Sequence, residues 1–168
     1  MKKTYFLALL LALSYMSAFA ANYDVSVYTD GAATVANTLR WAITQANGAD
    51  GNTISFSGTP TDITVVATAL PAINKNMTIN TGSTMITIAA LAATNIITVN
   101  AGKTVTLNYL TLKNATAAAL NTSGTTTVNN CVFTGNNSTN GGGTRVYGGS
   151  LSCNYCTFSG NTGATAAE

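Results

Sequence analysis

Three segments late in the chain share one pattern of apolar and polar positions. Leu107–Leu112, Val128–Phe133 and Cys153–Phe158 align without gaps, at offsets of 21 and 25 residues. Apolar residues fill the first, fourth and sixth positions of each segment, and asparagine fills the second. A unit that recurs at such an interval is typical of a solenoid. Because the runs alternate Val-type and Thr-type residues and are broken by Asn and Gly, they predict β-strands rather than helices.

The same alternation predicts further strands between residue 52 and the aligned segments. The expected strands are Thr53 to Phe56, Ile63 to Ala67, Met77 to Ile79, Met85 to Ala89 and Ile96 to Val99. Turns rich in Asn and Gly separate them. At about 21 to 25 residues per coil, residues 52–168 predict an all-β fold, a right-handed parallel β-helix of about five coils.

Residues 21–51 have a different periodicity. Tyr23 to Tyr28 alternates like a short strand, and the apolar residues after it recur at helical spacing: Leu39, Ala42, Ile43 and Ala46. They predict an amphipathic helix of about three turns, with Asn37 capping its start and Gly48 just beyond its end. We expect this N-terminal cap to cover the first coil, with Trp41 packed in the core, because an uncovered coil exposes apolar side chains and strand edges.

Residues 1–20 have the composition of a secretory signal peptide. Lys2 and Lys3 precede an apolar run from Tyr5 to about Met16, and Ala18-Phe19-Ala20 provides small residues for cleavage. The run is shorter than the ~20 residues of a membrane-spanning helix. We therefore expect cleavage after Ala20 and a mature chain that is secreted, without a membrane span.

Charge and composition narrow the classes of partner. Charged residues make up 7% of the chain, and without Lys2 and Lys3 the seven basic residues fall to five, equal to the five acidic ones. Nucleic acid is not an expected partner, because its binding needs a concentrated basic face. We expect a surface coated with Thr, Ser and Asn.

The chain has three cysteines, Cys131, Cys153 and Cys156. All three align with Leu or Val positions of the repeat, so we expect them to be buried apolar fillers. A disulfide remains an alternative, because Cys131 and Cys156 share one column and neighbouring coils lie about 4.8 Å apart. A metal site is not expected, since the chain has no histidine.

Two columns of the repeat lie next to each other. In the first, Asn108, Asn129 and Asn154 are expected to form a ladder of amide hydrogen bonds at a left-handed corner. In the second, Tyr109, Asn130 and Tyr155 are a candidate sugar-binding strip, although partly buried corner residues are the simpler interpretation. A third column of Leu112, Phe133 and Phe158 should stack as a ridge inside the cylinder.

Catalytic chemistry is not expected. The acidic residues are Asp24, Asp30, Asp50, Asp62 and Glu168, so residues 63–167 contain none. Polysaccharide lyases and hydrolases need carboxylates, and the chain has no histidine to act as a general base. We also expect no acidic partners within the repeats for the basic side chains of Lys75, Lys103, Lys113 and Arg145. The sequence therefore predicts a protein that is not an enzyme and uses no cofactor.

Short motifs in the repeats resemble a known family. Phe133 to Asn136 and Phe158 to Asn161 match an FxxN motif, with Phe133, Asn136, Phe158 and Asn161 at its ends, and Gly148-Gly149-Ser150-Leu151 approximates a GGA motif. These motifs are similar to the polymorphic outer membrane protein repeats of bacterial autotransporter-like adhesins. Residues 37–47 and 51–56 also resemble the opening of secreted right-handed β-helix repeat proteins.

The resemblance implies a right-handed β-helix at the bacterial cell surface or outer membrane, acting in adhesion or as a passenger scaffold. Ser150 replaces the expected alanine, only one GG motif is present, and no membrane barrel follows. We therefore expect residues 52–168 to be truncated at the C-terminus, with further β-helix coils or self-association at that open end. A host-surface or polysaccharide ligand is expected.

Two other functions remain open. The chain could be the N-terminal part of a polysaccharide-binding or polysaccharide-degrading β-helix enzyme whose catalytic coils lie elsewhere. It could instead be a structural surface-assembly module.

Overall fold

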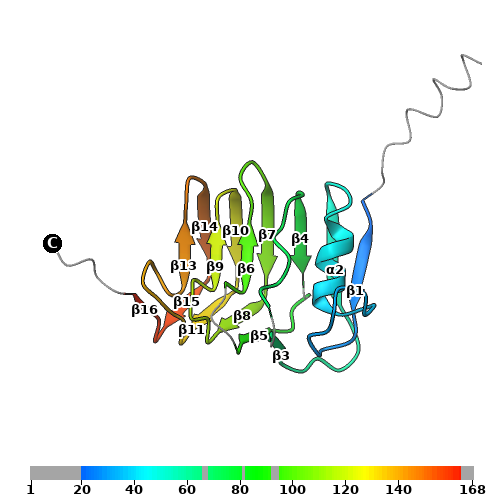
Figure 1. Ribbon diagram of the computed structural model, residues 1–168, viewed down its shortest axis with the longest axis horizontal. Helices are drawn as coiled ribbons and strands as arrows, with labels where there is room; N and C mark the ends of the chain where they lie inside the picture. Colours follow the sequence, from blue (N-terminus) through cyan, green and yellow to red (C-terminus); the bar gives the residue numbers. More distant parts are fainter. Residues whose placement is uncertain (1–19, 66–67, 81, 92–94, 164–168) are drawn as a thin grey trace, which may run out of the picture.

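The computed structural model describes residues 20–65, 68–80, 82–91 and 95–163. The expected signal peptide therefore lies outside the described residues, apart from Ala20, as does Glu168. Within the described part the chain forms one helix and 16 strands. Most of these strands stack in parallel sheets along one axis (Figure 1).

The strands form three main sheets and a short pair. The first sheet contains, in spatial order, β1 (Asn22–Val25), β2 (Asn52–Phe56), β4 (Met77–Asn80), β7 (Thr104–Asn108), β10 (Thr125–Asn129) and β14 (Ser150–Asn154). The second contains β15 (Thr157–Ser159), β11 (Val132–Thr134), β8 (Leu110–Lys113), β5 (Ile86–Ala90) and β3 (Ile63–Val65). The third contains β13 (Thr144–Val146), β9 (Leu120–Thr122) and β6 (Ile97–Val99), and β12 (Asn137–Ser138) pairs with β16 (Thr162–Gly163).

Every pair of neighbouring strands is parallel, so the chain is a parallel β-solenoid, as the sequence predicts. Ile73 bridges Val99 and extends the third sheet by one coil. The described strands thus make four complete turns and the start of a fifth, against an expected five.

Alternate residues of the first sheet point into the cylinder. One inward column holds Ile54, Ile79, Leu107 and Val128, all fully buried. In the second sheet Leu112, Phe133 and Phe158 form the predicted ridge, and the two phenylalanine rings stack with centroids 4.8 Å apart. Burial of the apolar side chains in these two columns stabilises the stacking of successive coils.

Helix α2 (Leu39–Ala46) packs against β1 and β2 at the N-terminal end of the stack (Figure 1). Its buried apolar side chains belong to the same core as the strands: Leu39, Ala42, Ile43 and Ala46. Trp41 is half-buried, packs against that core, and contacts Tyr23 edge-to-face with ring centroids 5.9 Å apart. The helix therefore covers the first coil.

The predicted start of the helix is wrong by one residue. Thr38 is the N-cap, with an extended backbone and a hydroxyl that accepts a hydrogen bond from the Trp41 N–H at 3.2 Å. Asn37 instead has a left-handed backbone, with φ of 63°. The helix has 8 residues and is shorter than the expected three turns.

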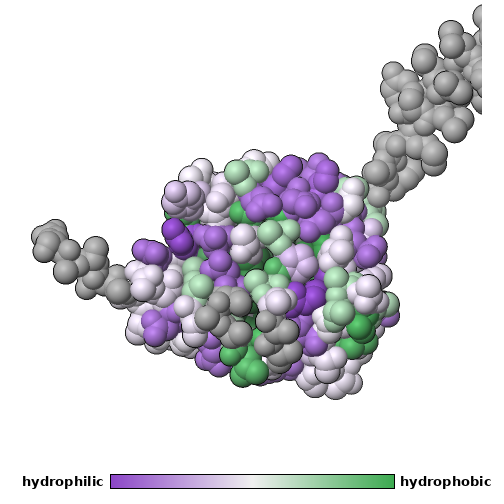
Figure 2. Space-filling model, in the orientation of Figure 1, coloured by the Kyte–Doolittle hydropathy of each residue, from purple (hydrophilic) through white to green (hydrophobic). Residues whose placement is uncertain are grey.

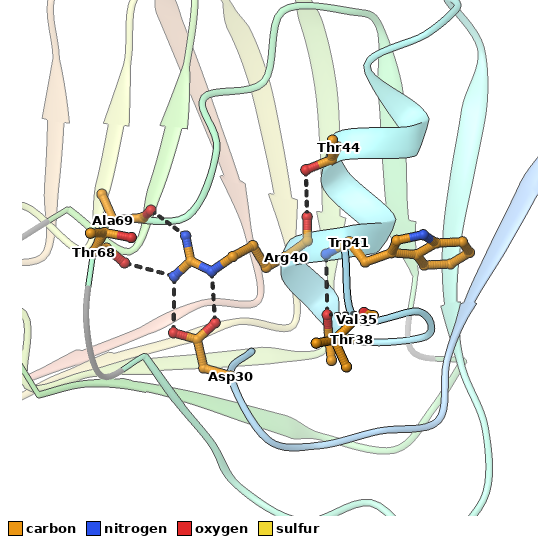
Figure 3. Close-up of polar contacts among 8 residues, drawn as sticks. All are labelled: Asp30, Val35, Thr38, Arg40, Trp41, Thr44, Thr68 and Ala69. Atoms are coloured by element: carbon orange, nitrogen blue, oxygen red, sulfur yellow. Dashed lines mark hydrogen bonds and ion pairs between the residues drawn. The ribbon is translucent and has the colours of Figure 1, made fainter. Parts of the chain in front are cut away.

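Arg40 joins the cap to the first coil (Figure 3). Its guanidinium donates to both carboxylate oxygens of Asp30 at 2.9 Å, and to the carbonyl oxygens of Thr68 and Ala69 at 2.7 Å. Arg40 is buried, and its charge is balanced by the Asp30 carboxylate. A bidentate pair of this kind is a strong and directional form of ion pair. Arg40 therefore has a structural role.

Two expectations about side chains are wrong. Lys113 was expected to lack an acidic partner, but its Nζ lies 2.8 Å from Oδ2 of Asp62. Stacking of β3, β5 and β8 brings these residues together across 51 positions of sequence. Cys131 is buried as expected, whereas Cys156 is half-buried and Cys153 is exposed. Cys153 continues the inward column of Val128, but no described coil covers it.

Candidate binding surface

The outward side chains of β2, β4, β7, β10 and β14 form a polar surface that we call the hydroxyl–amide face. It comprises three columns, namely Thr104, Thr125 and Ser150; Thr53, Thr78, Thr106, Thr127 and Ser152; and Asn108, Asn129 and Asn154. None of the five strands contains a charged residue. The face therefore presents only neutral donors and acceptors from its side chains.

The parallel registers fix the spacing of this face. Neighbouring strands of a sheet lie about 4.8 Å apart, and side chains two residues apart along a strand lie about 6.8 Å apart. Thr104, Thr125 and Ser150 are exposed, and Ser152 is exposed at the end of its column. The hydroxyl groups thus form a repeating two-dimensional array.

The predicted asparagine ladder is present in this face. Nδ2 of Asn129 donates to Oδ1 of Asn108 at 2.8 Å, and Nδ2 of Asn154 donates to Oδ1 of Asn129 at 2.8 Å. Asn129 and Asn154 therefore each donate one bond to the coil before. Because every bond has the same direction, the amides are held in one orientation along the edge of the face.

The left-handed corner lies one residue later than predicted. Tyr109, Asn130 and Tyr155 have φ of 55°, 52° and 54°, whereas the ladder asparagines belong to regular strands. The N–H of Tyr109 donates to the carbonyl of Asn129, and that of Asn130 donates to the carbonyl of Asn154. Main-chain hydrogen bonds thus join neighbouring coils at this corner, and the side-chain amides of the ladder join the same coils one residue earlier.

The three residues of the candidate sugar strip do share one corner column. Tyr109 and Asn130 are half-buried, whereas Tyr155 has 89% of its surface exposed. Tyr155 follows Asn154 directly and lies at the border of the hydroxyl–amide face. An exposed aromatic ring beside amides and hydroxyls has the chemistry for stacking on the apolar side of a sugar ring.

The two FxxN asparagines form a second set of inter-coil bonds, on a different corner. Nδ2 of Asn136 donates to the carbonyl of Leu112 at 3.0 Å, and Nδ2 of Asn161 donates to the carbonyl of Phe133 at 2.8 Å. Their Oδ1 atoms accept from the N–H groups of Ala115 and Asn136, at 2.9 and 3.1 Å. These asparagines hold coils together rather than offering their amides to a ligand.

The GG motif lies on yet another corner, before β14. Gly148 has φ of 81°, a conformation that suits glycine. A Cβ on Gly149 would lie 2.1 Å from the carbonyl oxygen of Gly124, so no larger residue fits without a shift of the backbone. Gly148 therefore serves the left-handed turn, and Gly149 serves the close stacking of coils.

The described carboxylates are each bound to a separate part of the scaffold. Asp24 accepts from the hydroxyls of Ser55 and Ser57, and Asp50 accepts from the N–H of Asn76. Asp30 and Asp62 pair with Arg40 and Lys113 as described above. In residues 20–163, apart from the gaps given above, no cluster of three or more Cys, Asp or Glu side chains could hold a metal ion.

Figure 2 shows the molecule from the side on which β13, β9 and β6 lie in front of β14, β10 and β7. Hydrophobic areas on this side are scattered among hydrophilic ones. In the part of the chain that the structure describes, no helix has the length and hydropathy of a membrane span.

Sequence reasoning located the asparagine column but not the hydroxyl columns beside it. The sequence does contain a pattern that could have located them. A Thr or Ser residue stands two and four positions before each asparagine of the ladder, in Thr104-Val105-Thr106, Thr125-Thr126-Thr127 and Ser150-Leu151-Ser152.

Comparisons with protein-family models, with curated proteins and with solved structures found no match.

Proposed function

We propose that this chain is a segment of an exported, non-enzymatic β-helix protein of the bacterial cell surface, acting as an adhesin or passenger scaffold. The FxxN and GG motifs support this proposal through their similarity to polymorphic outer membrane protein repeats. The ligand we propose is a neutral polysaccharide on a host or neighbouring cell.

The observation that carries the proposal is the uncharged, repeating hydroxyl–amide face. Thr and Ser hydroxyls both donate and accept hydrogen bonds, as do the hydroxyls of a sugar. A single such bond contributes about 0.5–1.5 kcal/mol, so one contact would bind weakly. A repeating polymer can make many of them at once, and the combined avidity exceeds that of any single contact.

The absence of charged side chains from the strands of the hydroxyl–amide face also argues for a neutral ligand. Binding of an anionic polymer would depend on basic side chains and would weaken strongly with salt. The strands of the face carry none, and Tyr155 at its border supplies an apolar surface instead. The four described carboxylates contribute to the scaffold through the contacts given above.

The test is a binding assay with the full chain, fluorescently labelled, on insoluble neutral glucans and on an anionic polysaccharide. We expect binding to a neutral glucan that changes little between low and high salt. The variant Thr106→Val/Thr127→Val removes two hydroxyls at nearly constant shape. It should weaken binding roughly 30-fold, since two bonds of about 1 kcal/mol each are lost.

The matched control is Thr111→Val. Thr111 is a half-buried outward residue of β8, in the second sheet, and its neighbour in the adjacent coil is already Val132. This variant should bind as the unmodified chain does. An equal loss of binding affinity in Thr111→Val and in the Thr106→Val/Thr127→Val variant would overturn the proposal. Salt-sensitive binding to the anionic polysaccharide alone would also overturn it.

A second candidate function is assembly through the end of the stack. Phe158 has 48% of its surface exposed, whereas Phe133, one coil earlier in the same column, is fully buried. We propose that a further coil, of a longer chain or of a second copy, covers this end. A sedimentation coefficient that rises with protein concentration, and rises less in Phe158→Ser, would support a second copy. A monomer at all concentrations would exclude a second copy.

A further inference from the structure

The three cysteines lie in the last two described coils. Cys153 is the fourth residue of β14, and Cys156 lies three residues later, beyond the corner at Tyr155. Cys131 occupies the position of Cys156 in the coil before, because Val132 pairs with Thr157 in the parallel register. Two pairings are therefore conceivable for Cys156, one within its coil and one between coils.

The corner directs both positions of the within-coil pair toward the interior. In the preceding coils the equivalent residues, Leu107 with Leu110 and Val128 with Cys131, are all buried. Cys156 lies close enough to Cys153 to contribute to the raised pKa of the Cys153 thiol. The four-residue Cys-x-x-Cys segment thus places both thiols at inward positions around one left-handed residue, Tyr155.

The pairing between coils has poorer geometry. The Cys131 thiol points to the carbonyls of Leu107 and Asn129, at 3.7 and 3.4 Å. The Cys156 thiol makes the equivalent contacts one coil later, with Val128 and Asn154, at 3.5 and 3.4 Å. The two thiols therefore point in the same direction rather than at each other, which is unfavourable for a disulfide.

We propose that Cys153 and Cys156 form a disulfide within one coil when the exported chain meets a disulfide oxidant, and that Cys131 remains a free thiol. The Cys153 thiolate attacks a sulfur of the oxidant's disulfide and releases one thiolate from it. The Cys156 thiolate then attacks Cys153 in that mixed disulfide and releases the second. The chain loses two protons and two electrons, and the oxidant is reduced to two thiols.

Accessibility and acidity favour this order. Cys153 is exposed and so can reach an oxidant, whereas burial raises the pKa of Cys131 to about 11 and keeps that thiol protonated. Partial desolvation and the neighbouring Cys156 raise the pKa of the Cys153 thiol, so oxidation should be faster at higher pH. Because the bridge lies within one coil, stacking of another coil would not separate its two sulfur atoms.

Trypsin separates the possible bridges. Cleavage after Lys113 and Arg145 places Cys131 in peptide 114–145 and both Cys153 and Cys156 in peptide 146–168. The full chain is purified after export, treated with oxidised glutathione, alkylated with iodoacetamide in denaturant and digested with trypsin. The masses of the peptides are then measured by mass spectrometry. We expect peptide 146–168 unalkylated and about 2 Da lighter than its reduced form, and peptide 114–145 with one alkyl group.

Two variants complete the experiment. Cys131→Val should leave the mass loss in peptide 146–168 unchanged. Cys153→Ala should abolish the mass loss and leave Cys156 alkylated or carrying glutathione. Cross-linked peptides 114–145 and 146–168, or alkylation of all three cysteines after glutathione treatment of the unmodified chain, would overturn the proposal.

Discussion

The side-chain amide of Asn161 donates a 2.8 Å hydrogen bond to the main-chain carbonyl of Phe133, one coil earlier. Asn136 makes the equivalent bond to Leu112 at 3.0 Å. In both cases the oxygen of the same amide accepts a main-chain N–H of the earlier coil. Each FxxN asparagine therefore satisfies two main-chain groups that the corner would otherwise leave unpaired.

Asn136→Ala should lower the free energy of unfolding by about 2–4 kcal/mol, because it leaves the Ala115 N–H and the Leu112 carbonyl unsatisfied in a buried corner. Urea denaturation measures the change. The matched control is Asn137→Ala, at the exposed neighbouring position, which should change stability by less than about 0.5 kcal/mol. Equal effects of the two substitutions would contradict a specific role for the buried amide.

Arg40→Met should lower the free energy of unfolding by about 3–5 kcal/mol, because it removes the guanidinium that balances the charge of the buried Asp30 carboxylate. The double variant Asp30→Asn/Arg40→Met should recover part of that loss, and hydrogen exchange should show faster opening of α2 in the single variant. Lys113→Gln breaks the exposed pair with Asp62 and should cost at most about 1 kcal/mol. A similar cost for both ion pairs would show that burial does not set their contribution.

Stability should fall at alkaline pH through Cys131. Its folded pKa is raised to about 11 by burial, above the usual thiol value. The unfolded chain therefore loses its proton first, and the stabilising contribution is complete below about pH 8.5 and lost as the pH rises to the folded pKa. Urea denaturation between pH 8 and 11 should show a decline of about 2–3 kcal/mol. The stability of Cys131→Val, which has no thiol to titrate at this position, should decline less. The same decline with pH in both proteins would refute the assignment of the effect to Cys131.

Gly124→Ala should be far more destabilising than Gly148→Ala. A Cβ on Gly124 would lie 2.3 Å from the Lys103 carbonyl oxygen and 2.7 Å from that of Asn100, and neither main-chain atom can move alone. We expect a loss of about 3 kcal/mol or more at Gly124. Gly148 has open space around its Cβ position, and its φ of 81° should cost alanine about 1–2 kcal/mol. Thermal unfolding of both variants decides the order.

The fold could be predicted because each coil repeats the same alternation. An inward column such as Ile54, Ile79, Leu107 and Val128 is visible in the sequence as a recurring apolar position. The ladder of Asn108, Asn129 and Asn154 follows from the same alignment, since parallel register places equal positions at hydrogen-bonding distance. The aligned repeats thus predict long-range contacts that the sequence of a single strand does not reveal.

The features that were missed depend on contacts outside the repeat. The exposure of Cys153 depends on whether a coil lies over it, which its local sequence does not encode. The Asp62–Lys113 pair joins residues at the ends of long side chains in different coils. The left-handed corner fell on Tyr109 rather than Asn108 because main-chain bonding between coils, not the intrinsic preference of asparagine, selects the residue that turns.

Between the coil of β7, β8 and β9 and the next coil, the number of residues that separates paired positions differs from sheet to sheet. From β7 to β10 and from β8 to β11 the offset is 21 residues, whereas Leu120 of β9 pairs with Thr144 of β13, 24 residues later. The added residues lie between β11 and β13, where Gly141 and Gly143 occur. Insertions and deletions can therefore accumulate at this corner during evolution, while the strands on either side keep their partners and the cylinder keeps its cross-section.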